Sequence, residues 1–130
     1  MSDAAAAEMP IFTKTYDFLA WLVPTTNNFP RAHRYAATQR LLDAAFSFLE
    51  RTVEANNVRG GDRLRLLVAA GAELDKVRLY LRLAHTWHWM NDGQYEHSAR
   101  MVAELGRLLG GWQNATRQGP GGAGKDRGAR

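Results

Sequence analysis

Two pairs of arginines are the side chains in this sequence best suited to binding an anion. The first pair, Arg31 and Arg34, lies in the stretch FPRAHRY, directly after Pro30. Proline suits the first position of a helix, so this stretch predicts a helix start. A helix N-terminus carries a partial positive charge and favours anions, so cations placed there need another reason. A negatively charged partner is such a reason, because long arginine side chains extend past apolar neighbours into solvent.

The second pair, Arg78 and Arg82, is spaced four residues apart, so the two guanidinium groups are neighbours on one helix face and repel each other. Trp89 falls on the same strip of the helix. Guanidinium groups beside an aromatic ring are typical of a surface that contacts phosphates and stacks on bases. The alternative is a solvated face on which Glu73, Asp75 or Glu104 pairs with these arginines. The predicted nucleic-acid-binding residues are therefore Arg31, Arg34, Arg78 and Arg82.

The segment HTWHWMNDGQYEH contains residue types that could bind a metal, namely His85, His88, Asp92, Glu96 and His97. Imidazole and carboxylate groups together suit zinc or iron. The spacing does not support such a site, because a turn separates His97 from the other two histidines. The Glu-x-x-His pairs of di-iron bundles are also missing. We therefore predict no metal site, and exposed or hydrogen-bonded histidines instead.

Enzymatic chemistry finds little support in the sequence. The chain has no cysteine, which excludes disulfides, thiolate metal sites and cysteine nucleophiles. The stretch GPGGAGK resembles a phosphate-binding loop in composition, but Asp126 stands where the motif needs Ser or Thr. We expect no catalytic residues and no cofactor. The seventeen Lys and Arg against thirteen Asp and Glu give a net charge of +4, which favours a polyanionic partner modestly.

Four helices must position these residues, because helical spacing runs through the body of the chain and no useful strand pattern occurs. Pro24, the pair Gly60-Gly61 and the stretch MNDG separate the helices, Asp62 is a candidate cap for the third, and Asn91 or Asp92 for the fourth. Gly110 and Gly111 predict where the last helix ends. Short connections favour an all-α, up-and-down antiparallel four-helix bundle. The predicted helices span residues 13–23, 30–56, 62–90 and 92–110.

Two of these helices carry more apolar surface than one bundle core needs. A helix that contributes to a single core needs an apolar face about 100° wide, and a second stripe would form an exposed patch. We therefore predict that copies of the chain assemble, although a central helix buried on both sides would be an alternative. On the second helix the apolar arc covers nearly half the circumference, and on the third a stripe stands apart from the main apolar face. The arc comprises Tyr35, Leu42, Phe46, Leu49 and Val53 together with Leu41, Ala45 and Phe48, and the separate stripe comprises Val68, Leu79, Leu83 and Met90.

The two ends of the chain differ in composition from its body. Residues 1–12 lack the basic start of a secretory signal, and we interpret them as a flexible leader. Residues 113–130 end in the Gly-rich, basic stretch QGPGGAGKDRGAR, which predicts a disordered tail. The bundle domain is then 13–112. No apolar run approaches the ~18 residues of a membrane span, so we expect a cytoplasmic protein that contacts no membrane.

The order and spacing of several segments resemble the accessory variability determinant (Avd) proteins of diversity-generating retroelements. The resemblance covers residues 13–112 and rests on TKTYDFLAWLVP, FPRAHRY, LLDAAFSFLERTVEAN and LDKVRLYLRLAHTWHWMNDGQYEHSARMVAELGRLLGGW. It implies a non-enzymatic partner of the element's reverse transcriptase that forms a homopentameric barrel of four-helix bundles. It also implies a basic surface for RNA or DNA that supports mutagenic reverse transcription, here at the four arginines.

The wider group of four-helix proteins encoded in ribosomal RNA intervening sequences is the rival interpretation. Those proteins share the FP…Y helix start but usually lack the LLGGW ending and an arginine-rich third helix. A member of that group would act as a protein-interaction module with no role in a retroelement. Binding of nucleic acid by the isolated protein separates the two interpretations.

Overall fold

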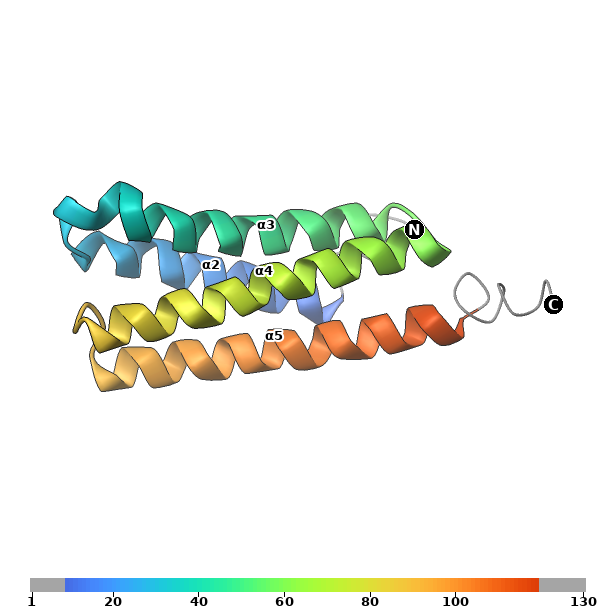
Figure 1. Cartoon of the computed structure of the whole chain (residues 1–130). Helices are drawn as coiled ribbons and strands as arrows, with labels where there is room; N and C mark the ends of the chain where they lie inside the picture. Colours follow the sequence, from blue (N-terminus) through green and yellow to red (C-terminus); the bar gives the residue numbers. More distant parts are fainter. Residues whose placement is uncertain (1–8, 120–130) are drawn as a thin grey trace.

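The computed structural model describes residues 9–119, and every regular element among them is helical. Long helices α2, α3, α4 and α5 form an up-and-down bundle in which α4 packs against both α3 and α5 (Figure 1). This confirms the predicted all-α four-helix architecture. None of the described helices is both long and apolar enough to cross a membrane. The elements are α2 (Pro10–Thr25), η1 (Thr26–Asn28), η2 (Arg31–His33), η3 (Arg34–Thr38), α3 (Gln39–Asn56), α4 (Gly60–Thr86) and α5 (Asp92–Gln118).

The core is a continuous apolar cluster to which all four long helices contribute. Its fully buried members include Leu22 of α2, Phe48 of α3, Leu74 of α4 and Leu105 of α5. Burying a side chain of this size stabilises a fold by about 1.5–3 kcal/mol, so this cluster determines how the helices pack. On α4 the buried positions recur at alternating steps of three and four residues, which is the spacing of one helix face.

Two helices begin earlier in the sequence than predicted. Helix α2 begins with Pro10 at its first turn, and Ile11 is buried, so the prediction of a flexible leader is wrong for residues 10–12. Residues 1–8 lie outside the described part of the chain. Helix α4 likewise begins at Gly60, two residues before the predicted cap Asp62. Asn91 caps α5 in a reciprocal pair of hydrogen bonds with Gln94, as one of the two predicted alternatives had it.

Helix α5 passes through Gly110 and Gly111 and ends at Gln118, so the predicted glycine stop is wrong. Each glycine costs a helix interior about 1 kcal/mol, which tertiary contacts beyond it outweigh. The Trp112 ring meets Phe12 edge-on at 6.0 Å, and Gln113 donates a hydrogen bond of 3.1 Å to the carbonyl of Leu67. Residues 113–118 therefore belong to the bundle rather than to a disordered tail. Residues 120–130 lie outside the described part.

The start of the second predicted helix is irregular. Residues 31–38 form a 3-10 turn followed by a π-helical segment, and the α-helix begins only at Gln39. A wheel at 100° per residue does not apply to such a segment, because a π-helix has more residues per turn. Arg31, Arg34 and Tyr35 are exposed in this irregular segment, with Tyr35 at 80% exposure.

The second apolar stripes are accessible in the single chain. Phe46 and Val53 of α3 and Leu79 of α4 are exposed, while Leu42 and Leu49 are half-buried. The stripes also include exposed Val68 and Leu83 of α4. Met90 departs from the prediction: α4 ends at Thr86, and the following turn returns Met90 to the core, where it is buried.

Two aromatic residues of α2 offer a matched test of this core. Phe18 is 2% exposed and Tyr16 is 72% exposed, although they are two residues apart. Replacing a buried phenylalanine with alanine removes its apolar contacts and leaves a cavity, so Phe18→Ala should lower the free energy of unfolding by about 3–5 kcal/mol. Tyr16→Ala should change it by less than about 1 kcal/mol. Urea unfolding followed by circular dichroism measures both. Equal losses for the two variants would contradict the packing described here.

Candidate nucleic-acid interface

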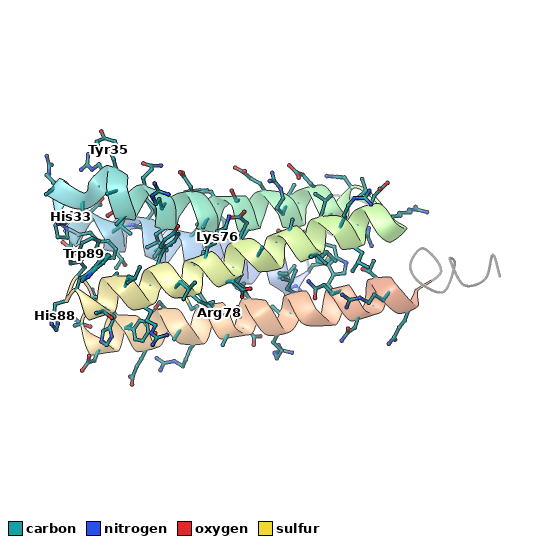
Figure 2. All side chains as sticks on the ribbon, in the orientation of Figure 1. His33, Tyr35, Lys76, Arg78, His88 and Trp89 are labelled. Carbon is teal, nitrogen blue, oxygen red and sulfur yellow. The ribbon has the colours of Figure 1, made fainter. Side chains whose placement is uncertain are left out.

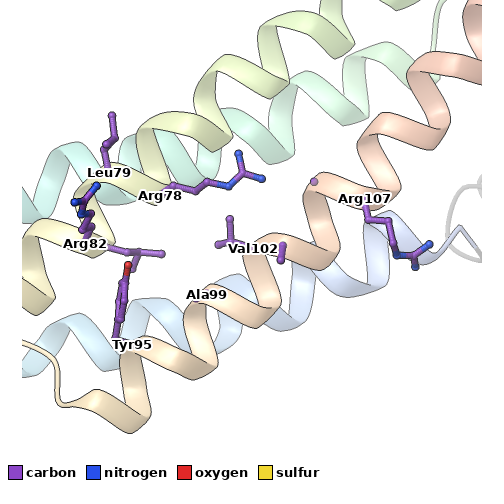
Figure 3. Close-up of a pocket in the computed structure, with 10 residues that line it drawn as sticks. Arg78, Leu79, Arg82, Tyr95, Ala99, Val102 and Arg107 are labelled. Carbon is purple, nitrogen blue, oxygen red and sulfur yellow. The ribbon is translucent and has the colours of Figure 1, made fainter.

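A groove of about 710 Å³ runs between α4 and α5 and brings three arginines together (Figure 3). Arg78 and Arg82 come from α4, and Arg107 comes from α5. The groove is open on the α5 side because three of the α5 residues that line it are small: Ala99, Ala103 and Gly106. These follow one another at steps of four and three residues, so they share one face of α5. The remaining lining residues are Leu79, Leu81, Tyr95 and Val102.

Arg78 crosses this groove from α4 toward α5 (Figure 3). Its Nη1 donates a hydrogen bond of 2.7 Å to Asp75 Oδ1, and its Nη2 lies against the backbone of α5 at Gly106. A Cβ atom at Gly106 would stand 2.5 Å from that Nη2, which is closer than two such atoms can approach. Gly106 therefore provides the space in which the Arg78 guanidinium rests.

The other two arginines of the groove differ in their ionic partners. Arg107 makes two hydrogen bonds to Glu104, at 2.9 and 2.6 Å, and extends away from Arg78 (Figure 3). The hydrogen bond from Arg107 holds the pKa of Glu104 below its usual range. Arg82 has no carboxylate of the described residues within 4 Å. Of these three arginines, Arg82 is thus the one whose charge is most available to an incoming anion.

The groove continues along the bundle beyond Arg78. A second hollow of about 500 Å³ shares Arg78 and Gly106 with the first and extends past Gly110 to Arg117. Its floor includes Gly71 of α4, so small residues from both helices keep it open. Positively charged side chains therefore occur at intervals along one continuous depression on the α4–α5 face.

The structure separates the two predicted arginine pairs. Arg78 and Arg82 lie together in the groove, as their spacing indicated, and Asp75 pairs with Arg78 as the alternative anticipated. Arg31 and Arg34 are exposed in η2 and η3, at the end of the bundle where His33 lies (Figure 2), and they do not line the groove.

Sequence reasoning missed Arg107 and Arg117 as lining residues of the groove. The signal that could have revealed them was the run of small residues on α5, because such a run leaves space beside the neighbouring helix.

The histidines that suggested a metal make other contacts. His85 Nε2 lies 2.8 Å from Asp92 Oδ1, and the His85 ring stacks on Tyr95 at 4.4 Å. The ring of His97 packs edge-on against Trp21 at 5.1 Å. Among residues 9–119, no three histidine, aspartate or glutamate side chains come together as a metal site would need. The contacts of His85 connect the end of α4 to the start of α5, and the contact of His97 connects α5 to α2.

The family model described as bAvd-like matches residues 9–116, which covers α2, α3 and α4 in full, α5 as far as Thr116, and the residues that line the groove of about 710 Å³. The chain belongs to the bAvd-like family. This membership confirms the resemblance to accessory variability determinant proteins. No curated protein matches the sequence. The matched span begins at Met9, so the part of α2 that the sequence pattern assigned to a leader is within this bAvd-like domain.

Gly106 allows the position of Arg78 to be tested apart from folding. Gly106→Ala should leave the free energy of unfolding unchanged or raise it by up to about 1 kcal/mol, because alanine favours a helix. The added methyl group should displace the Arg78 guanidinium and weaken binding of a polyanion such as heparin several-fold at low salt. Urea unfolding and heparin-column elution measure the two effects. Gly111→Ala is the control, since a Cβ there meets nothing within 4 Å and Gly111 lines neither hollow of the groove. Identical elution of both variants would contradict the assignment.

Proposed function

We propose that this bAvd-like protein is a non-enzymatic accessory factor of a diversity-generating retroelement. In this role it binds the element's reverse transcriptase and RNA or DNA, and it supports mutagenic reverse transcription. Family membership supports the accessory role. The observation that carries the nucleic-acid part is the α4–α5 groove, in which Arg82 has no carboxylate partner among the described residues and Arg78 rests above Gly106.

Phosphate groups fit this groove by charge and by hydrogen bonding. A guanidinium presents five N–H donors in a planar fork that matches phosphate oxygens. Arg78 gives one nitrogen to Asp75, which leaves the other donors for a ligand. Binding would release counterions, so affinity should fall steeply as salt rises. Around Arg82 the lining residues are aliphatic side chains, arginines and Tyr95, without an Asn or Gln amide that could read adenine. The proposed contact of these arginines is to the phosphate backbone, which carries no sequence information.

Self-assembly is part of the proposal. Leu79 is 58% exposed, and with Phe46, Val53 and Val68 it gives α3 and α4 an apolar surface that water does not favour. Association of copies through these stripes would bury that surface, and the family resemblance implies five copies in a ring. Each chain adds a net charge of +4, so a ring would concentrate positive charge for a polyanion.

The same stripes favour a second candidate function. Exposed Phe46, Val53 and Leu79 suit a protein partner as well as another copy of the chain. In that case the protein is an interaction module that does not touch nucleic acid. It would either dock the polymerase or, as a protein of the ribosomal intervening-sequence type, bind another protein with no role in a retroelement. Binding of single-stranded RNA by the isolated protein at low salt distinguishes the candidates, because only the first predicts it.

The groove arginines give a direct test of the proposed function. Arg78→Ala combined with Arg82→Ala should weaken single-stranded RNA binding at least tenfold and should make the salt dependence shallower by about two ions. The control is Arg51→Ala with Arg65→Ala, which removes the same charge from two arginines already paired with Glu54 and Asp62. Fluorescence anisotropy across a potassium chloride series measures both. Equal effects of the two double variants would show that net charge, not the groove, determines affinity.

The apolar stripes give a test of assembly. The wild-type protein should have a mass several times that of the 14.5 kDa chain in light scattering. Phe46→Glu with Leu79→Glu should reduce that mass toward a single chain, because burying the new carboxylates is unfavourable. Asn114→Glu adds a charge at an exposed position of α5, outside the stripes, and should preserve the assembly. A wild-type protein with the mass of one chain at every concentration would contradict this part of the proposal.

A further inference from the structure

An aromatic cluster occupies the end of the bundle where α3 begins and α4 ends. Trp89 stacks on His33 with ring centroids 5.4 Å apart and an interplanar angle of 16°, and it packs against Phe29 at 5.5 Å. Trp87 meets Trp89 at 5.0 Å. Figure 2 shows His33, Trp89 and His88 at this end, well away from Arg78 near the middle. The α4–α5 groove and this cluster are therefore separate features.

Trp87 is the exposed member of the cluster. It is 46% exposed, whereas Trp89 is half-buried and Phe29 is buried. An indole ring held against a second indole has little freedom to move, so its outer face is a fixed apolar platform. Such a platform in water suits a ligand that is itself flat and aromatic.

A small hollow of about 90 Å³ lies beside this platform and is lined by Phe29, Tyr80, Leu83 and both tryptophans. Thr38 of the π-helical segment also lines it. Thr38 is only 8% exposed, and its Oγ1 has no hydrogen-bond partner among the described residues. An unpaired buried hydroxyl costs about 1–3 kcal/mol, which a ligand with a polar edge would offset. The hollow therefore suits a group that has both an apolar face and a hydrogen-bonding edge.

The charge around the platform is positive. Between Asp17 and Asp43, and again between Asp75 and Asp92, the sequence contains no carboxylate. Among the basic residues of those stretches, Arg31 and Arg34 lie within two residues of His33, whose ring stacks on Trp89. Arg31 and Arg34 are exposed and have no carboxylate of residues 9–119 within 4 Å. The acidic residues nearest in sequence beyond α4 are Asp92, which lies against His85, and Glu96 at the start of α5.

We propose that this end of the bundle binds an unpaired nucleobase of a single strand. The base stacks on Trp87, its edge hydrogen-bonds the Thr38 hydroxyl, and the adjoining phosphates contact Arg31 and Arg34. This inference rests on the proposed function, which it extends from backbone contact to base contact. A base in a duplex has both faces covered by its neighbours, so the site selects unpaired nucleotides. A second copy of the chain is a poorer occupant, because it would bring the same arginines toward this cationic surface.

Substitution of Trp87 tests the stacking. Base–aromatic stacking contributes about 1–3 kcal/mol, so Trp87→Leu should weaken binding of a single-stranded 12-mer RNA by about tenfold. Trp87→Leu and the wild-type protein should bind a duplex of the same sequence with equal affinity. They should also bind equally a 12-mer with abasic sites throughout, because neither ligand offers an unpaired base. Trp87→Phe should retain most of the affinity, because a planar ring remains. Tyr16→Leu, at an exposed aromatic on α2, is the control and should bind as the wild type does. Fluorescence anisotropy at fixed low salt measures each affinity.

Thr38→Val tests the hydrogen bond with a change of nearly the same shape. It should lower the affinity for the single strand a few-fold. It should also raise the free energy of unfolding, because it removes the unpaired hydroxyl. A variant that gains stability and keeps full affinity would exclude Thr38 from the base contact.

The outcomes separate this inference from the function on which it rests. If the wild-type protein binds single strands and Trp87→Leu binds them equally well, base stacking is wrong and backbone binding at the groove stands. If Trp87→Leu keeps its affinity but reduces the mass of the assembly in light scattering, the aromatic cluster is a protein contact instead. If the wild-type protein binds no nucleic acid in any form, both proposals fail.

Discussion

The packing of α4 between α3 and α5 determines which charged and apolar side chains the protein exposes on its surface. Six residues of α4 are buried at alternating steps of three and four: Leu67, Ala70, Leu74, Val77, Leu81 and Ala84. Burial of that one face holds the rest of the helix in a fixed orientation. Arg78 is then directed toward α5, while Leu79 and Arg82, which also line the groove, are exposed to solvent. A turn of α4 about its axis would exchange these roles, so the core contacts also control the charge that the surface presents.

The small residues of α5 decide whether the seam between the two helices is closed or open. A large side chain at Gly106 would fill the space that Arg78 now occupies, and large side chains at Ala99 and Ala103 would fill other parts of the groove. Small residues instead forgo some apolar burial and leave a groove with cationic side chains along it. Part of that charge is already matched, because Asp75 binds Arg78 and Glu104 binds Arg107. Exposed pairs of this kind contribute about 0–1 kcal/mol, so phosphate oxygens can compete for the same donors.

Sequence patterns predicted the parts of this structure that depend on local periodicity. Hydrophobic spacing and turn residues predict the helix count and the turn before Asn91. The spacing of four residues predicts that Arg78 and Arg82 lie on one face of a helix. The failures occurred where tertiary contacts outweigh a local preference. Gly110 does not end α5, because Trp112 and Gln113 make contacts beyond it. Arg31 and the residues after it depart from the wheel because the backbone there is not α-helical, and no residue type signalled the π-helical segment.

Continuity along α4 connects the two proposed contacts. An α-helix rises 1.5 Å per residue, so Arg82 lies about 6 Å from Thr86, the last residue of α4. Trp87 follows at once, and the aromatic platform therefore begins one turn beyond the last cation of the groove. The hollow beside Trp87 is lined by residues of η3, α3 and α4, whereas the groove lies between α4 and α5, so a single strand that contacts both would have to pass around the end of α4. In the proposed arrangement the groove would attract any polyanion, whereas the platform would add a requirement for an unpaired base. Together the two proposed contacts would favour a single strand over a duplex without reading its sequence.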